Sequence, residues 1–178
     1  MKISSYLDSY EIISISMEYA RKCHEETNHS YDGQPYTVHL KMAYDCGVEF
    51  KHLLPSINDE IVALSACSTH DVIEDCRQSY NNVKDVCGES VADIVYALTN
   101  EKGKNRKERA NDKYYEGIRN TPNATFVKLC DRIANVRYSK EKGSRMFELY
   151  KKEHKHFYDQ LYDDKLKPMF DELNKLVN

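Results

Sequence analysis

The chain has 178 residues, and its 26 lysines and arginines against 29 acidic residues give a formal net charge of −3. This length suits one domain over residues 1–178, which buries about two-thirds of its unfolded surface. A nucleic-acid polymer is excluded as partner, since a protein that binds one carries a basic excess. With 31% charged residues and only short apolar stretches, the composition also excludes a disordered chain and a membrane-spanning one.

The first residues and the cysteines indicate the compartment. Asp8 and Glu11 interrupt the apolar residues near the N-terminus, so no signal peptide is expected there. The six cysteines include no Cys-x-x-Cys pair of the kind that binds zinc. We therefore expect reduced, mostly buried thiols in a cytoplasmic protein.

Apolar residues at helical spacing predict helices along most of the chain. Polar residues 27–34, ending in Asp32-Gly33, predict a turn, and Pro35 suits the first turn of the helix that follows it. Asn58, Asp59 and Glu60 predict the start of another helix. The helices are predicted in this order, with approximate bounds: 11–26, 35–48, 58–70, 81–86 (ending at Gly88), 90–98, the later half of 102–119, 144–161 and 165–176.

The apolar residues Phe126, Val127 and Leu129 fit either a strand or a buried helix by periodicity alone. Its helical surroundings favour helix. Since no segment alternates as a half-buried strand would, the fold class predicted is all-α, in a single helical bundle.

The densest chemical signal is the segment 70–75, which reads HDVIED. If it is helical, Glu74 lies one turn from both His70 and Asp71, while Val72 and Ile73 face the core. Three acids in six residues repel one another unless a cation neutralises them. Imidazole and carboxylate groups together are good ligands for a divalent metal.

Further ligands should come from elsewhere in the chain. His39 and Asp131 both look like polar groups at the edge of an apolar core, and Asp131 directly follows the run at 126–129. Each also has a plainer interpretation, since His39 could be a hydrogen-bonded core histidine and Asp131 a surface acid. His154 and His156 lie among charged residues typical of a solvated face, and His24 and His52 have no acidic or histidine partner at a useful spacing.

Three motifs in this order resemble the HD-domain metal-dependent phosphohydrolases. They are GQPYTVH at 33–39, HDVIED at 70–75 and VKLCDRIANVR at 127–137. More narrowly, the pattern resembles the hydrolase domain of the RelA/SpoT proteins and their stand-alone relatives, the small alarmone hydrolases. The resemblance runs from about Ile12 to Tyr138, and residues 144–178 lie outside it as C-terminal helices.

The resemblance implies a function and a site. The reaction would be removal of the 3′-pyrophosphate from (p)ppGpp, a small anionic nucleotide. One divalent metal, usually Mn²⁺ in this family, would be held by His39, His70, Asp71 and Asp131. Glu74 and Asp75 would be the catalytic acids, since a metal lowers the pKa of its bound water and a neighbouring carboxylate accepts the proton. The nucleotide pocket would include Tyr36, Asn135 and Arg137.

The substrate's negative charge also calls for cations. Arg137 is one candidate, and a basic cluster on the loop after Leu98 is another, although a solvated basic face explains that cluster equally well. The cluster consists of Lys102, Lys104, Arg106, Lys107 and Arg109.

One departure keeps the choice of substrate open. The family usually has an Arg-Lys pair shortly before the glycine of its first motif, whereas this chain has Asn28-His29-Ser30-Tyr31-Asp32. His29 or Tyr31 could stack on a base in place of the arginine, without its permanent charge. One alternative is therefore an HD phosphatase releasing orthophosphate from NADPH or another nucleotide, and another is a non-catalytic nucleotide sensor. The C-terminal helices could cover the core or pair with a second subunit in a homo-oligomer.

Overall fold

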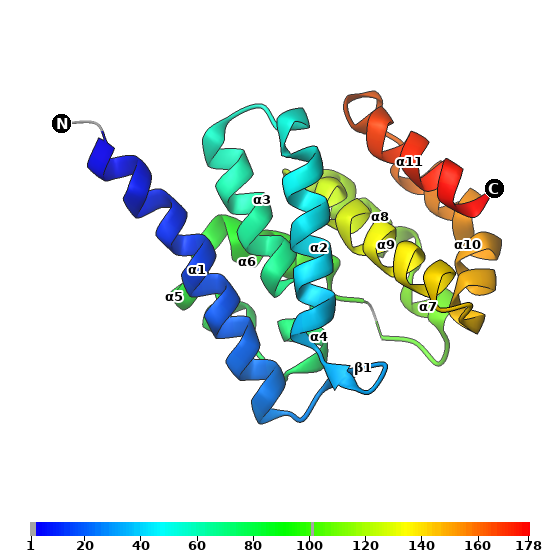
Figure 1. Ribbon diagram of the computed structural model, residues 1–178, viewed down its shortest axis with the longest axis horizontal. Coiled ribbons are helices and arrows are strands. Elements are labelled where there is room, and N and C mark those ends of the chain that lie inside the picture. Colours follow the sequence, from blue (N-terminus) through cyan, green and yellow to red (C-terminus); the bar gives the residue numbers. More distant parts are fainter. Residues whose placement is uncertain (1–2, 101) are drawn as a thin grey trace.

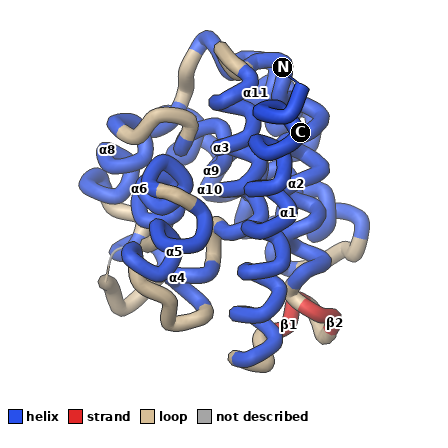
Figure 2. Tube along the Cα trace, turned by 90° about the vertical axis from the view of Figure 1, so that its left-hand side faces the viewer, coloured by secondary structure: helices blue, strands red, loops and turns tan. Residues whose placement is uncertain are grey.

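The computed structural model describes residues 3–100 and 102–178, and the side chains from Tyr10 onward. Helices make up nearly all of its regular structure, which confirms the all-α prediction (Figures 1 and 2). The elements are α1 (Ile3–Glu26), β1 (Ser30–Tyr31), β2 (Gln34–Pro35), α2 (Thr37–Phe50), η1 (Lys51–Leu53), α3 (Ile57–Thr69), α4 (Val72–Asp75), α5 (Tyr80–Cys87), α6 (Glu89–Leu98), α7 (Arg106–Arg109), α8 (Asp112–Asn120), α9 (Ala124–Glu141), α10 (Arg145–Leu161), η2 (Asp164–Leu166) and α11 (Lys167–Val177).

Helix α2 lies between α3 and α9, and α3 in turn packs on α1, so the four helices stand side by side (Figure 1). Gly47 allows the close approach of α2 to α3, because a Cβ at this position would lie 2.9 Å from the Leu64 side chain and 3.2 Å from Cys67 Sγ. Helices α10 and α11 pack on the other side of α9. The main core runs through all these layers, and the six cysteines are buried free thiols, as predicted.

Several boundaries differ from the predicted ones for local reasons. Helix α1 begins at Ile3, well before the predicted start at Glu11, and the N-cap of α3 is Ser56, whose hydroxyl accepts from the Asp59 amide. Pro35 is not in a helix: it pairs with Ser30 in a two-stranded hairpin around the Asp32-Gly33 turn, where both residues have positive φ. That hairpin is the strand structure the sequence reading missed, since two-residue strands are too short to show alternation.

The segment 70–75 is not one continuous helix. Helix α3 ends at Thr69 with His70 as its C-cap, and α4 starts at Val72 with Asp71 as its N-cap. Because the helix is interrupted here, His70 and Asp71 do not follow the 3.6-residue spacing of one continuous helix. Both side chains point toward His39 on α2. Val72 is fully buried, as expected. The run at 126–129 is helical in α9, which settles the ambiguity between strand and helix.

Candidate metal centre and active site

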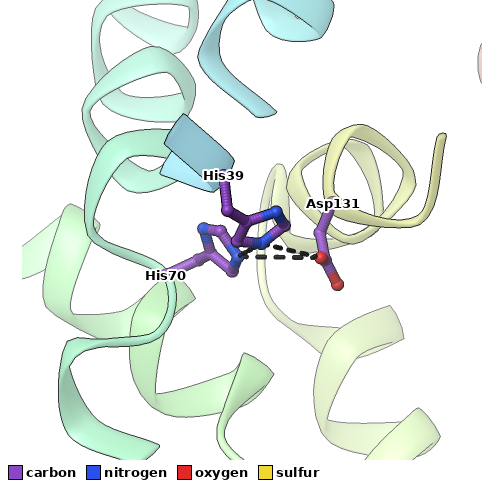
Figure 3. A group of neighbouring side chains, drawn as sticks. All are labelled: His39, His70 and Asp131. Carbon is purple, nitrogen blue, oxygen red and sulfur yellow. Dashed lines mark hydrogen bonds and ion pairs between the residues drawn. The ribbon is translucent and has the colours of Figure 1, made fainter. Parts of the chain in front are cut away.

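Four elements bring the predicted ligands together where α2, α3, α4 and α9 meet. His39 lies in the first turns of α2, His70 and Asp71 form the break between α3 and α4, and Asp131 lies on α9. Figure 3 shows His39, His70 and Asp131 pointing toward one another from three elements. Both imidazoles are almost fully buried, so these polar groups are directed inward and away from bulk water.

The donor atoms have the spacing of ligands around one ion. The two Nε2 atoms of His39 and His70 are 3.1 Å apart, and Asp131 Oδ1 lies 3.4 Å and 3.7 Å from them. Asp71 Oδ2 lies 3.0 Å from His70 Nε2 and 3.5 Å from His39 Nε2. Ligands bound to one ion at roughly 2.0–2.2 Å are themselves roughly 3–3.5 Å apart. The residues therefore fit a divalent metal, and two imidazoles with two carboxylates are a suitable donor set for one.

Neighbouring groups orient these side chains. His70 Nδ1 lies 2.9 Å from the Cys67 carbonyl oxygen and donates to it, which directs the Nε2 lone pair toward the other ligands. Lys128 Nζ donates to Asp131 Oδ2 at 2.9 Å, leaving Oδ1 to face the histidines. The Tyr36 hydroxyl donates to Asp71 Oδ2 at 2.5 Å.

Charge is balanced within this buried group. Burial alone raises the pKa of the Asp71 carboxyl, but the charge of His70 and hydrogen bonds from both histidines hold it well below its usual range. Burial acts in the same way on Asp131, where Lys128 and the histidines hold the pKa well below normal. Conversely, the two carboxylates raise the pKa of the His70 imidazole well above its usual value despite burial. Protons on the imidazoles thus balance the carboxylates, and a metal would displace them on binding.

Glu74 and Asp75 stand beside the ligand group on α4. Both lie on the wall of a cavity of about 600 Å³ that also reaches His39, Asp71 and Asp131. The Asn100 amide donates to both oxygens of Glu74 at 2.9 Å, which holds that carboxylate at the cavity edge. Burial, followed by the negative charge of Asp71, raises the pKa of Asp75 to about 6. A carboxyl group with such a pKa can gain and lose a proton near neutral pH, as a general base must.

The wall of the cavity also carries basic residues. They come from α7, α9 and α10. Glu153 pairs with Arg132 at 3.0 Å and with Arg106 at 2.7 Å. Lys128 pairs with Asp131 at 2.9 Å. The other cations of the wall have no ion-pair partner among residues 3–100 and 102–178. They are Lys107, Arg109 and Lys152.

The predicted substrate-binding residues divide between the cavity and other places. Tyr36 and Asn135 line the cavity. Arg137 is elsewhere: it forms ion pairs with Glu49 of α2 at 2.8 Å and Glu172 of α11 at 2.7 Å. It therefore ties α9 to its neighbours in this structure.

Two other predicted contacts also lie outside the cavity wall. Lys102 borders a separate hollow between α6 and α8. His29 stacks on the Tyr36 ring, with centroids 4.0 Å apart, and its Nδ1 is 3.7 Å from Asp75 Oδ2. It stands next to the carboxylate pair, but its ring face is already covered by Tyr36.

Sequence reasoning missed several residues at the site. Lys128 is not among the predicted site residues, although its position three residues before Asp131 on a helix is a signal for an ion pair. Tyr31, expected as a side chain that could stack on a base, stacks on the His39 ring with centroids 4.9 Å apart and donates to Asn135 at 2.8 Å, so it connects the hairpin to α9. His24, expected to have no partner, lies 3.1 Å from His29 through their Nδ1 atoms.

A sequence model of the HD domain matches residues 16–166 of the 178. The chain belongs to the HD-domain family. The match extends through α10, beyond the segment that carries the three motifs. Among the described residues no helix has the length and apolar character needed to cross a bilayer.

Within this family, similarity is found to curated pyrophosphohydrolases. The guanosine-3′,5′-bis(diphosphate) 3′-pyrophosphohydrolase of Aquifex aeolicus is 28% identical over 76% of this chain and 19% of its own length. The MESH1 enzyme of the same description from Drosophila melanogaster is 31% identical over 46% of this chain and 45% of its own. The human MESH1 protein is 26% identical over 66% of this chain and 63% of its own length. The chain thus spans about a fifth of the length of the Aquifex aeolicus protein and about half of that of the Drosophila melanogaster protein.

The fold agrees with a solved structure. A protein described as a metazoan ortholog of SpoT that hydrolyzes ppGpp superposes with a TM-score of 0.69, over 92% of this chain and 94% of that one. At 21% identity the likeness shows the HD-domain fold.

Proposed function

We propose that this chain is a metal-dependent nucleotide phosphohydrolase, acting in the cytoplasm as a (p)ppGpp 3′-pyrophosphohydrolase with Mn²⁺ bound by His39, His70, Asp71 and Asp131. The observation that carries the proposal is the convergence of these four side chains beside Glu74 and Asp75 in a cavity with basic walls. The pyrophosphohydrolases that are similar to the chain support the choice of substrate.

The cavity suits a nucleotide with several phosphates. Its volume of about 600 Å³ lies within the usual range for small-molecule sites. Its wall combines the ligand group with the cations of α7, α9 and α10, and these cations can bind phosphate groups. Net charge does not oppose this, because local cations act within about 10 Å whatever the sum over the chain.

Each residue then has a defined part in hydrolysis. The metal, when bound, polarises a phosphoryl oxygen and lowers the pKa of the attacking water. Asp75, with a pKa of about 6, accepts the proton of that water, and Glu74, held by Asn100, orients the water or the leaving group. Lys107, Arg109 and Lys152 bind the phosphate groups that lie farther from the metal.

The test is product identification with the Mn²⁺-loaded protein. Incubation with ppGpp should release pyrophosphate and GDP, and Glu74→Gln and Asp75→Asn should each abolish most of the release while keeping the metal. Glu89→Gln is the matched control, since Glu89 is exposed and pairs with Lys84 away from the cavity. Absence of ppGpp turnover by the wild-type protein would refute the substrate assignment.

One observation favours a second candidate, a phosphatase releasing orthophosphate from NADPH or another nucleotide. His29, in the segment where the family usually carries an Arg-Lys pair, has its ring packed on Tyr36 and brings no permanent charge to a base. Orthophosphate from NADPH, with no pyrophosphate from ppGpp, would establish this alternative. Tight binding of ppGpp without any turnover in Mn²⁺ would instead indicate a nucleotide sensor.

A further inference from the structure

The loop and short helix of residues 102–110, here called the α7 segment, are held in shape by their own residues. The Asn105 side chain accepts from the Glu108 amide at 3.0 Å, and the Glu108 carboxylate accepts from the Lys104 amide at 2.8 Å. This reciprocal arrangement is similar to a capping box. Gly103 lies against the same turn, because a Cβ there would be 2.7 Å from Glu108 Cβ. The α7 segment is therefore a compact unit.

One residue of α10 links this unit to the rest of the fold. Arg106 Nε donates to Glu153 Oε1 at 2.7 Å, and Arg106 Nη2 donates to Glu153 Oε2 at 3.3 Å. Among the residues that the structure describes, no other hydrogen bond or ion pair joins a side chain of the α7 segment to a residue outside 102–111. Because residues 102–109 are exposed, burial contributes little to holding them in place. The contact with Glu153 is therefore what fixes the unit.

Glu153 is in turn fixed to α9. Arg132 Nη1 donates to Glu153 Oε2 at 3.0 Å. The Arg132 guanidinium lies 4.8 Å from the centroid of the Tyr150 ring and 4.6 Å from that of Phe157, and both rings are buried. Cation–π contacts with two buried rings keep this guanidinium in one place. Glu153 thus connects the α7 segment to the helix that carries Asp131.

A carboxylate is an unexpected group on the wall of a phosphate site. Glu153 lines the same cavity as the proposed metal ligands, and its negative charge by itself would repel a phosphate. Its two oxygens instead accept from three N–H groups of Arg106 and Arg132. Directly after Arg106 along the chain, Lys107 and Arg109 also line the cavity. The position of these two cations depends on the contact that Glu153 makes.

We propose that Glu153 is a positioning residue for substrate binding. By joining Arg106 to Arg132, it holds the α7 segment at the cavity wall, where Lys107 and Arg109 bind the phosphate groups of the substrate. The proposal rests on the phosphohydrolase function. It also gives α10, which lies outside the segment that carries the three motifs, a part in substrate binding.

The kinetic test is Glu153→Gln, because the two effects of this carboxylate have opposite signs. If it acts by charge alone, its removal should lower the KM of an anionic substrate. If it positions the α7 segment, KM for ppGpp should rise about tenfold while kcat changes less than about threefold, since phosphate contacts away from the reacting atoms are lost. Glu148→Gln is the matched control, because Glu148 is an exposed acid on the same helix and does not line the cavity.

A second variant separates the docking of the α7 segment from the packing of α9 on α10. Arg106→Gln keeps the ion pair between Arg132 and Glu153, so it carries the test even if Glu153→Gln does not fold. It should also raise KM about tenfold. The double variant should be no worse than Arg106→Gln alone, because both changes break the same contact. Single effects that multiply in the double variant would overturn the proposal.

Trypsin cleavage measures the docking without any turnover. Cleavage after Lys104 and Arg109 requires the α7 segment to open locally, so both variants should be cut about fivefold faster than the wild-type protein and Glu148→Gln. Inorganic pyrophosphate, used as the probe of the phosphate site, should slow cleavage in the wild-type protein and have little effect in Glu153→Gln. Equal cleavage of the wild-type and Glu153→Gln proteins would overturn the proposal.

The remaining outcomes distinguish this proposal from the function on which it rests. An unchanged or lower KM in Glu153→Gln would overturn the positioning role. A lower kcat with unchanged KM would do so as well, because it would place the effect at Asp131, next to Arg132, instead of at the α7 segment. If the wild-type protein turns over no substrate, the phosphohydrolase function fails. Positioning is then decided by cleavage, and equal protection by pyrophosphate in the two proteins would overturn it.

Discussion

Metal binding should stabilise the fold by an amount that the donor geometry lets us predict. Because Asp71, Asp131 and both imidazoles converge only in the folded chain, the ion binds the native state alone. At a metal concentration 100 times Kd, this linkage is worth about 2.7 kcal/mol. For a domain of this size, each kcal/mol raises Tm by about 2–4 °C, so Mn²⁺ should raise Tm by about 5–11 °C.

Asp71→Asn tests the assignment. Loss of a ligand that weakens metal binding about 100-fold leaves the site only half filled at the same concentration, and the linkage falls to about 0.4 kcal/mol. The rise in Tm should then shrink to about 1–2 °C. The assay is thermal unfolding with and without Mn²⁺ after chelation, with Asp159→Asn as control, because Asp159 is an exposed acid paired with Lys155.

The effect should also depend on pH in a defined direction. The pKa of His70 is raised well above its usual value in the metal-free protein, so protons compete with the ion and the rise in Tm should grow from pH 6 to pH 8. An Asp71→Asn variant that keeps the full metal-induced rise would refute the ligand assignment, as would a wild-type rise that shrinks over this pH range.

Three further predictions concern Glu74, Asp75 and the partly buried Lys128. Glu74→Gln and Asp75→Asn should keep metal and fold but lower kcat by about 10²–10⁴, measured by product release; activity near wild type in both would exclude them from the mechanism. The pKa of Asp75 is raised to about 6, so the folded protein is more stable when Asp75 is protonated, and this stability is lost as the pH rises from about 4 to 6. Above pH 6, Asp75→Asn should therefore raise the free energy of unfolding by about 1–2 kcal/mol, a figure that allows for the 31% exposure of the side chain. Denaturant unfolding of both proteins measures the difference. Lys128→Met should lower the free energy of unfolding of the metal-free protein by about 2–3 kcal/mol, because it leaves the Asp131 carboxylate without its cation. The control Lys155→Met, at an exposed ion pair, should lower it by under about 1 kcal/mol. Equal losses in the two variants would contradict the argument.

The sequence predicted most helices because their information is local. Helix α5 ends and helix α6 begins at Gly88, whose positive φ interrupts the helical path. The buried face of α6 is formed by the residues that periodicity indicates, Val91, Ile94, Val95 and Leu98. The features that the sequence did not predict are equally local, but they are too short to show a repeating pattern of apolar residues. The two-residue strands around Gly33 and the break between His70 and Asp71 involve only a few residues each.

The candidate site divides in the same way. The motif order predicted His39, His70 and Asp131, and the structure brings them together. Arg137 lies on the same helix as Asp131, but Glu49 on α2 and Glu172 on α11 direct it to ion pairs away from the cavity. Those partners are far away in sequence, so no motif could show which way the side chain points.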